Sequence, residues 1–296
     1  MAIPESQLET WSHQGAVTTA KNTYASIKAN LQSADASYAE KDTQPYLQGS
    51  YGNDTNIYGD SDVDVVFQLN STFHRNLDRL PPDQVEAYRR AFSDASYHFS
   101  DFRQDVATHL QAKFGYQQVI SGNKSLKLIG TSGRLAADII VCCQYRDYQW
   151  FRGLHDQRYD EGIYFKTSDG HEIVNYPKRH LANCSAKHQS TGNCFKPTVR
   201  ILKNMRSYMV DQKIIGSDLA PSYFIEGMLY NVPDDQYNGD FSSTFCNCVN
   251  WLVKTDRSKF VCPSGKHSLF GSSSVQWDDA RCAQFLDALV NLWNRW

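Results

Sequence analysis

The sequence predicts an α+β fold, in which a mixed sheet with its helices precedes a helical carboxy-terminal half. Short apolar runs of the kind that form buried strands occur between residues 63 and 141. Two longer stretches with apolar residues at helical spacing flank the first of these runs. From Pro177 onward the helical spacing predominates. We therefore expect two lobes, formed by residues 1–175 and 176–296.

Each element is predicted from its local pattern. Apolar residues at helical spacing from Ser6 to Gln32 predict one long amino-terminal helix. The run Val65–Phe67 predicts a buried strand. After Pro81-Pro82 we expect a second long helix that ends at Gly115. Further strands are expected at residues 116–120, 124–129 and 135–141, followed by a hairpin that turns at Ser168-Asp169-Gly170.

Length and charge limit the possible classes of protein. A chain of 296 residues can bury a substantial core, and its net charge of −2 gives no general attraction to nucleic acid. The sequence has no apolar stretch near the roughly 20 residues of a membrane span, and its first residues lack an apolar signal region. We expect a cytoplasmic monomer that needs no membrane.

The chain has eight cysteines, which we expect to be reduced in a protein without a signal peptide. His180, Cys184 and His188 recur at every fourth position and would share one helix face, with Cys194 beyond them. Such a set could bind zinc, or it could lie on a helix surface without a metal. The sequence leaves both interpretations open.

The run GSYGNDTNIYGDSDVDVVF contains the most specific pattern in the chain. Successive side chains of a strand point to opposite faces, so Asp62 and Asp64 are expected on the same face, where their oxygens suit Mg²⁺. Upstream, Gly49 permits close backbone approach and Ser50 offers a hydroxyl and an N–H group to a phosphate. An isolated Asp-x-Asp pair is usually a solvated turn or a helix cap, whereas this combination favours a metal site.

A third carboxylate, Asp138, interrupts the apolar run at residues 135–141. An unpaired carboxylate in a buried strand would be costly. A metal shared with Asp62 and Asp64 would offset that cost and complete the carboxylate set of a two-metal site. An ion pair with Arg134 is the alternative, and the sequence leaves both open.

Three cations recur on one face of the helix expected at residues 194–210. Lys196, Arg200 and Lys203 follow the spacing i, i+4 and i+7. Such a stripe could neutralise the phosphates of a nucleotide, or it could be an ordinary solvated face. After Pro221, Tyr223 could stack on a base or pack in the core.

These motifs resemble the polymerase-β-type nucleotidyltransferases, and within them the bacterial CD-NTases, which are cGAS/DncV-like enzymes. The resemblance rests on GSYGNDTNIYGDSDVDVVF, on RLAADIIV, and on FKPTVRILKNMRSYM followed by PSYFIEGMLYNVP, in the family's order from about residue 45 to about 232. It implies a polymerase-β-like lobe packed on a helical lobe. Asp62, Asp64 and Asp138 would bind two Mg²⁺ or Mn²⁺ ions and carry the catalysis. The resemblance further implies that the nucleotide and its phosphates contact Gly49, Ser50, Lys196, Lys203, Ser222 and Tyr223.

The resemblance also implies a function. The enzyme would join NTPs into a cyclic di- or trinucleotide with release of pyrophosphate, and the product would activate an effector in anti-phage (CBASS) signalling. We expect that no nucleic acid is required. The alternative is nucleotidyl transfer to RNA, to a protein or to a small molecule, and only cyclic synthesis would consume NTPs without another acceptor.

Overall fold

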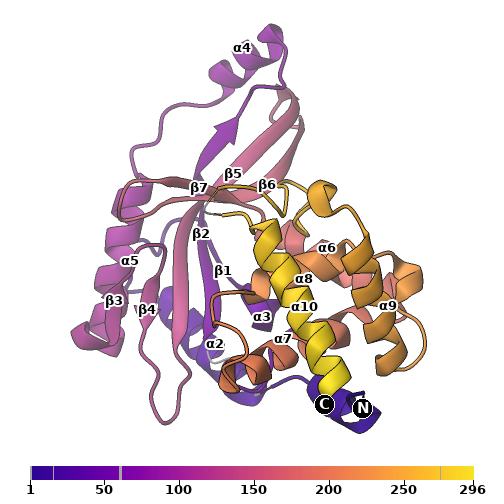
Figure 1. The fold of residues 1–296 in the computed structure, drawn as a ribbon. Helices are drawn as coiled ribbons and strands as arrows, with labels where there is room; N and C mark the ends of the chain where they lie inside the picture. Colours follow the sequence, from indigo (N-terminus) through magenta and orange to yellow (C-terminus); the bar gives the residue numbers. More distant parts are fainter. Residues whose placement is uncertain (1, 16, 60–61, 274) are drawn as a thin grey trace. The chain divides into compact units, whose positions relative to one another are not determined.

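The computed structural model describes residues 2–15, 17–59, 62–273 and 275–296, drawn in Figure 1. The chain divides into two compact units. The helical unit comprises Met1–Ala16, Gly49–Asp60 and Arg179–Trp296, and the sheet unit comprises Val17–Gln48 and Ser61–Lys178. The sequence places the main division after residue 175, whereas in the structure it follows Lys178 and two amino-terminal segments belong to the helical unit.

The sheet unit contains a seven-stranded mixed sheet with the order β1-β2-β5-β4-β3. β2 and β5 run parallel, while the other paired strands run antiparallel, with β6 joined to the second half of β5 and β7 joined to β6. This arrangement confirms the predicted mixed sheet and the α+β class. The strands are β1 (Thr43–Leu47), β2 (Val63–Asn76), β3 (Val119–Ser121), β4 (Leu126–Leu128), β5 (Ala137–Gly153), β6 (Asp156–Lys166) and β7 (Glu172–Asn175).

Helices α2 and α5 of the sheet unit pack on one face of this sheet. Phe102 of α5 packs on Phe67 of β2 with ring centroids 5.1 Å apart, and Tyr38 contacts both rings. All three side chains are fully buried, so they form the centre of the core on this face. The helical elements are α2 (Val17–Leu31), α4 (Pro82–Ala91), α5 (Phe99–Phe114) and the 3₁₀ turn η1 (Tyr116–Gln118).

Replacing Phe102 by Ala is expected to lower the free energy of unfolding of the sheet unit by about 3–5 kcal/mol, because the change leaves a cavity between α5 and β2. Chemical denaturation followed by fluorescence measures the change. Tyr116 is 78% exposed, so Tyr116→Ala is the matched control and should shift stability by less than about 0.5 kcal/mol. Equal losses in the two variants would contradict the assignment of Phe102 to the core.

The prediction of one long amino-terminal helix is wrong. The chain forms α1 (Glu5–Ser12) and α2, with extended backbone at His13 between them. Gly15 explains the break, because its N–H donates to the carbonyl oxygen of Asn56 at 3.2 Å. A Cβ atom on Gly15 would lie 2.3 Å from the carbonyl oxygen of Ile57, so the backbones approach too closely for a continuing helix with side chains.

The prediction of a single helix after Pro81-Pro82 is also wrong, because α4 and α5 are separate. Phe92 leaves α4 in extended conformation and packs on Tyr88 and Phe151, with centroids 4.7 and 5.7 Å away. A new helix then begins after His98, whose N–H donates to Asp101 in a capping box. The predicted end at Gly115 is confirmed, with φ of 102° at that glycine.

Strand lengths differ from the prediction more than strand positions do. The strand expected at residues 135–141 continues to Gly153, and the hairpin that it forms with β6 was not predicted. Residues 116–118 form a 3₁₀ turn before the short β3. The hairpin at Ser168-Asp169-Gly170 is confirmed, because it joins β6 to β7.

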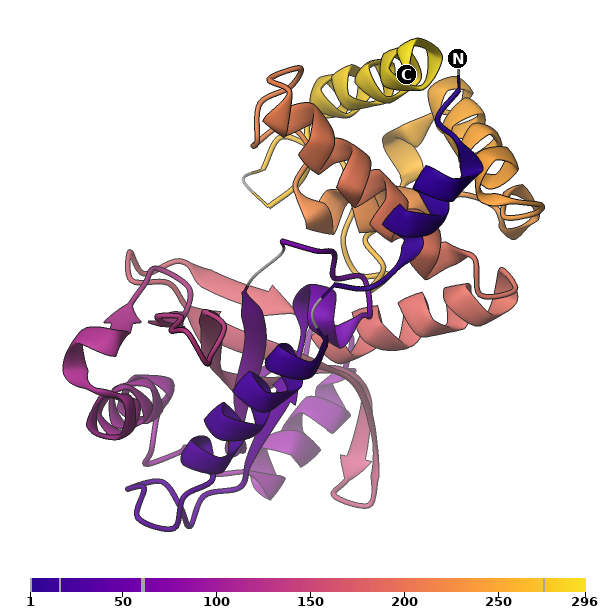
Figure 2. The same cartoon turned by 90° about the horizontal axis from the view of Figure 1, so that it is seen from below.

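The helical unit has one core, with α7 at its centre. Helix α7 contacts α1, α8, α9 and α10, and Figure 2 shows α1 lying alongside it. No helix among the described residues is long and apolar enough to cross a bilayer, and all eight cysteines are free thiols. The elements are α1, α3 (Gly49–Gly52), α6 (Pro177–Ser190), α7 (Phe195–Asp211), α8 (Ser222–Tyr230), η2 (Asp234–Gln236), α9 (Phe241–Lys254), η3 (Arg257–Lys259) and α10 (Asp279–Arg295).

Candidate functional site

Two of the three predicted carboxylates are neighbours in the sheet. The parallel register of β2 and β5 pairs Asp64 with Asp138, so both side chains leave the same face of the sheet. Both are partly exposed, and they lie on the face opposite to that of Phe67. Asp62 comes immediately before β2 and is exposed. The end of the sheet therefore carries carboxylates from two adjacent strands.

The surroundings of Asp138 include a hydroxyl group that was not assigned from the sequence. Ser125 Oγ donates to Asp138 Oδ1 at 2.8 Å, and Lys127 of β4 is the cross-strand neighbour of Asp138. Arg134, the alternative partner, donates its Nη2 to the carbonyl oxygen of Ile129 at 2.8 Å. The sequence could not indicate Ser125, because its contact depends on the antiparallel register of β4 and β5.

The carboxylate set fits a divalent cation. Like charges at paired positions of neighbouring strands repel each other, and a cation held by Asp64 and Asp138 would remove that repulsion. Carboxylate oxygens are the ligands that Mg²⁺ prefers, usually one or two per ion together with substrate phosphates and water. Partial exposure leaves room for such additional ligands.

The predicted phosphate-binding residues Gly49 and Ser50 lie in the helical unit, at the start of α3. Gly49 has φ of 64°, a left-handed conformation that favours glycine. The carbonyl oxygens of Gly49 and Ser50 accept hydrogen bonds from the N–H groups of Asn53 and Thr55 at 3.0 and 2.9 Å. These bonds fold the segment into a compact turn.

The three predicted cations of α7 all contact this segment. Lys196 Nζ lies 2.9 Å from Asp54 Oδ2, and Lys203 Nζ donates to the carbonyl oxygen of Thr55 at 2.8 Å. Arg200 Nη1 donates to the carbonyl oxygen of Asp54 at 2.5 Å. Lys196 is 6% exposed and Lys203 only 1% exposed. Lys196 and Lys203 are therefore buried polar contacts, and Arg200 between them is partly exposed.

Ser222 and Tyr223 form the first turn of α8. Ser222 Oγ accepts a long hydrogen bond of 3.4 Å from Arg206 Nη2. The ring of Tyr223 lies 5.5 Å from that of His180, and part of the side chain stays exposed. Burial of the rest raises the pKa of the Tyr223 hydroxyl well above its ordinary value, so it is a neutral hydrogen-bonding group.

The histidine and cysteine set predicted on α6 is divided in the structure. His180 and Cys184 lie with Glu226 of α8, and their possible ligand atoms are within 4.8 Å of one another. His188 Nδ1 instead accepts from the N–H of Lys196 at 3.4 Å, and Cys194 lies beside Gly192. Glu226 was not predicted, although it is a single acidic residue in the apolar helix SYFIEGMLY.

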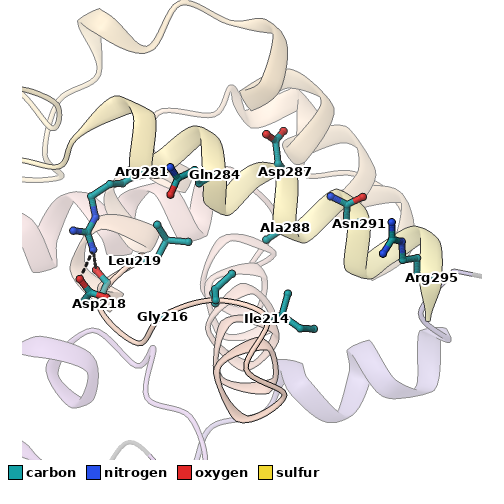
Figure 3. A pocket seen from close by; sticks show the side chains of 11 residues that line it. Ile214, Gly216, Asp218, Leu219, Arg281, Gln284, Asp287, Ala288, Asn291 and Arg295 are labelled. Atoms are coloured by element: carbon teal, nitrogen blue, oxygen red, sulfur yellow. Dashed lines mark hydrogen bonds and ion pairs between the residues drawn. The ribbon is translucent and has the colours of Figure 1, made fainter.

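The helical unit also has an open groove of about 720 Å³, shown in Figure 3. Polar side chains of α10, including Gln284 and Asn291, line one side, and Ile214 and Leu219 line the other. An ion pair between Arg281 and Asp218, with N and O 2.8 Å apart, lies at one end. These residues differ from those predicted for the site, so the groove is a separate feature.

Comparison with known proteins gives a consistent result. Residues 182–294 match the model of the cGAS/DncV-like nucleotidyltransferase C-terminal helical domain. The cyclic UMP-AMP synthase of Rhodothermus marinus is 45% identical over 100% of this chain and 99% of its own. The cyclic nucleotide synthase CdnE01 of Staphylococcus haemolyticus is 39% identical over the full length of both chains. The solved structure of the Rhodothermus marinus CdnE c-UMP-AMP synthase with Apcpp and Upnpp superposes with a TM-score of 0.90, at 46% identity, over 99% of this chain and 97% of that one.

Proposed function

This chain belongs to the cGAS/DncV-like nucleotidyltransferases, and from this membership we propose that it joins UTP and ATP into cyclic UMP-AMP. The observation that carries the proposal is the 45% identity with a cyclic UMP-AMP synthase along the whole of both chains. The paired carboxylates Asp64 and Asp138 support the same chemistry through the cations that they would bind. Nucleotidyl transfer requires the protein mainly to position the substrates and to stabilise charge.

In the proposed mechanism Asp62, Asp64 and Asp138 would hold two Mg²⁺ or Mn²⁺ ions. When bound, these ions would polarise the phosphates and assist deprotonation of the attacking hydroxyl. The ribose hydroxyl oxygen of one nucleotide forms a bond to the α-phosphorus of the other, and the bond from that phosphorus to pyrophosphate breaks. A second transfer closes the ring.

The helical unit supplies the proposed nucleotide contacts. Gly49 and Ser50 offer backbone N–H groups and a hydroxyl to phosphate oxygens. Lys196 and Lys203 bring positive charge toward the triphosphate. Ser222 and Tyr223 are the proposed contacts to the nucleoside.

We place the product in anti-phage (CBASS) signalling, where it would activate an effector. The enzyme is proposed to act as a monomer without an activating nucleic acid, consistent with its net charge of −2. Duplex DNA added to the reaction should leave the turnover unchanged, and a strong increase would contradict this part of the proposal.

The test is incubation of the purified protein with Mg²⁺ and radiolabelled NTPs, followed by phosphatase and chromatography. A phosphatase-resistant product that requires both UTP and ATP would support cyclic UMP-AMP synthesis. A resistant product from another pair of NTPs would overturn only the assignment of bases. NTP consumption that depends on added RNA or protein would instead favour the acceptor-dependent alternative.

Replacing Ser125 by Ala is expected to raise the Mg²⁺ concentration for half-maximal activity by about tenfold, because Asp138 loses the hydrogen bond that orients it. A Mg²⁺ titration of activity measures the shift. Ser125→Thr keeps the hydroxyl and should restore most of the affinity. An unchanged Mg²⁺ dependence in Ser125→Ala would show that this hydrogen bond has no part in metal binding.

A further inference from the structure

The segment 49–60 carries the predicted phosphate-binding residues, and it belongs to the helical unit although the strands on both sides of it belong to the sheet unit. Among its described residues, Ile57 is a buried apolar side chain, and Asn53, Thr55 and Asn56 are buried polar ones. Polar contacts from α7, α8 and the residues after α1 join this segment to the rest of the helical unit, and Gln14 and Gly15 supply those after α1. Three of them are the bonds from Lys196, Arg200 and Lys203 described above.

Glu226 of α8 provides a second point of attachment. Its Oε1 accepts from Asn53 Nδ2 at 2.7 Å, and its Oε2 accepts from Thr55 Oγ1 at 2.9 Å. His180 Nε2 and Cys184 Sγ of α6 lie 2.7 and 3.2 Å from Oε1. One carboxylate thus joins α6 and α8 to two positions of the segment, three and five residues after Ser50.

The carboxylate of Glu226 is buried and ionised. Glu226 is 5% exposed, and the four side chains that contact it are buried as well. Burial raises the pKa of Glu226, but the hydrogen bonds and the charge of His180, with the bonds from Cys184 and Thr55, lower it by more. Its pKa therefore lies below the ordinary value of a glutamate, and the carboxylate accepts hydrogen bonds at neutral pH.

The backbone between the two bonded residues is strained. Asp54 has φ of 54°, in the left-handed region that glycine favours and that other residues adopt less often. It is held there from both sides, because Asn53 and Thr55 are both bound to Glu226. Strain of this kind persists where surrounding contacts fix the conformation, often beside a ligand site.

We infer that Glu226 is a positioning residue that fixes the conformation of the phosphate-binding turn at Gly49 and Ser50. It acts through Asn53 and Thr55 and does not itself touch the substrate. The inference rests on the proposed function, because it gives Gly49 and Ser50 their role in triphosphate binding. It extends that function by linking α6 and α8 to the geometry of the turn.

A metal held by His180, Cys184 and Glu226 is the competing interpretation, since their ligand atoms lie within 4.8 Å of one another. The environment of the thiol favours hydrogen bonding. Cys184 Sγ lies 3.2 Å from Glu226 Oε1, and burial, followed by the neighbouring Glu226, raises the pKa of this thiol, which fits an S–H donor to the carboxylate. Asn53 Nδ2 also occupies the same Glu226 oxygen that His180 contacts.

The test combines nucleotide binding, kinetics and melting for Glu226→Gln, Asn53→Ala and the double variant Asn53→Asp/Glu226→Gln. The double variant exchanges donor and acceptor, so it can rebuild the bond between positions 53 and 226. Titration calorimetry with α,β-methylene-ATP measures binding without turnover. Each single variant should weaken binding by at least about tenfold and raise KM more than it lowers kcat, while the double variant should recover most of the loss.

Tyr237→Phe is the matched control. The Tyr237 hydroxyl is buried and donates to the carbonyl oxygen of Leu229, on the same helix as Glu226, at 2.6 Å. This control should lower the melting temperature about as much as Glu226→Gln, with no change in analogue binding. Unchanged binding in Asn53→Ala and Glu226→Gln, absence of rescue in the double variant, or stoichiometric zinc in the purified protein would overturn the inference. Weakened analogue binding in an enzyme that makes no cyclic product would instead support the inference and overturn the proposed function.

Discussion

Replacing Asp64 by Asn is expected to lower kcat/KM for cyclic dinucleotide synthesis by about 10³-fold or more. Removing one ligand charge from a metal site removes several kcal/mol of transition-state stabilisation, and each 1.4 kcal/mol corresponds to a factor of ten. Asp64 is the carboxylate for which this effect should be clearest, because the strand register fixes it beside Asp138. Product formation at saturating Mg²⁺ measures the loss.

The same variant relieves the repulsion between Asp64 and Asp138 when metal is absent, so it should lose less melting temperature in EDTA than at saturating Mg²⁺. The stabilisation that Mg²⁺ gives to the wild type should disappear in the variant. Asp94 is exposed, and Asp94→Asn should keep both activity and Mg²⁺ stabilisation. Preserved activity in Asp64→Asn would refute the carboxylate assignment.

Replacing Lys203 by Gln is the change for which we expect the second largest effect. Gln keeps an N–H donor for the carbonyl oxygen of Thr55 but removes the positive charge proposed to face the triphosphate. Loss of a buried charge that interacts with phosphate should weaken NTP binding by about 10- to 100-fold. Titration with α,β-methylene-ATP and the KM for ATP both report the change.

Measuring the binding of adenosine beside that of the triphosphate analogue identifies why NTP binding is weaker in Lys203→Gln. If Lys203 interacts with phosphate, binding of adenosine should differ little between the wild type and Lys203→Gln, whereas binding of the triphosphate analogue should fall. Lys254 is exposed at the end of α9, and Lys254→Gln serves as the charge-matched control in the same unit. Equal weakening of adenosine and triphosphate binding would assign Lys203 only the role of holding Thr55 in place.

The patterns that could be predicted from the sequence are those set by local periodicity. The resemblance carried by GSYGNDTNIYGDSDVDVVF correctly predicted the family, because its glycines and aspartates have fixed spacing within one short segment. The structure also confirms the predicted mixed sheet, the helical region after Pro177 and the helix end at Gly115. These predictions likewise came from local sequence patterns. The roles of Asp62, Asp64 and Asp138 stay predictions until the variants are measured.

The features that could not be predicted depend on contacts between distant parts of the chain. The break between α1 and α2 depends on the backbone of Ile57. This backbone lies so close to Gly15 that a side chain at position 15 would not fit. The sequence leaves open whether the cations of α7 contact phosphate or solvent, whereas in the structure they bind a segment 142 or more residues earlier. Glu226 was missed because an isolated acidic residue in an apolar helix does not reveal its hydrogen-bond partners.

The division of the chain has a consequence for how the protein is made. Synthesis on a ribosome delivers α1 and the segment 49–60 long before α7 and α8, which hold the partners of Asp54 and Thr55. The sheet unit has all its residues once Lys178 emerges, so it can fold first and hold the short segment as a loop between β1 and β2. A fragment beginning at Arg179 would remove Asn53 and Thr55 from Glu226 and the carbonyl oxygen of Thr55 from Lys203, so the helical unit should fold only in the complete chain.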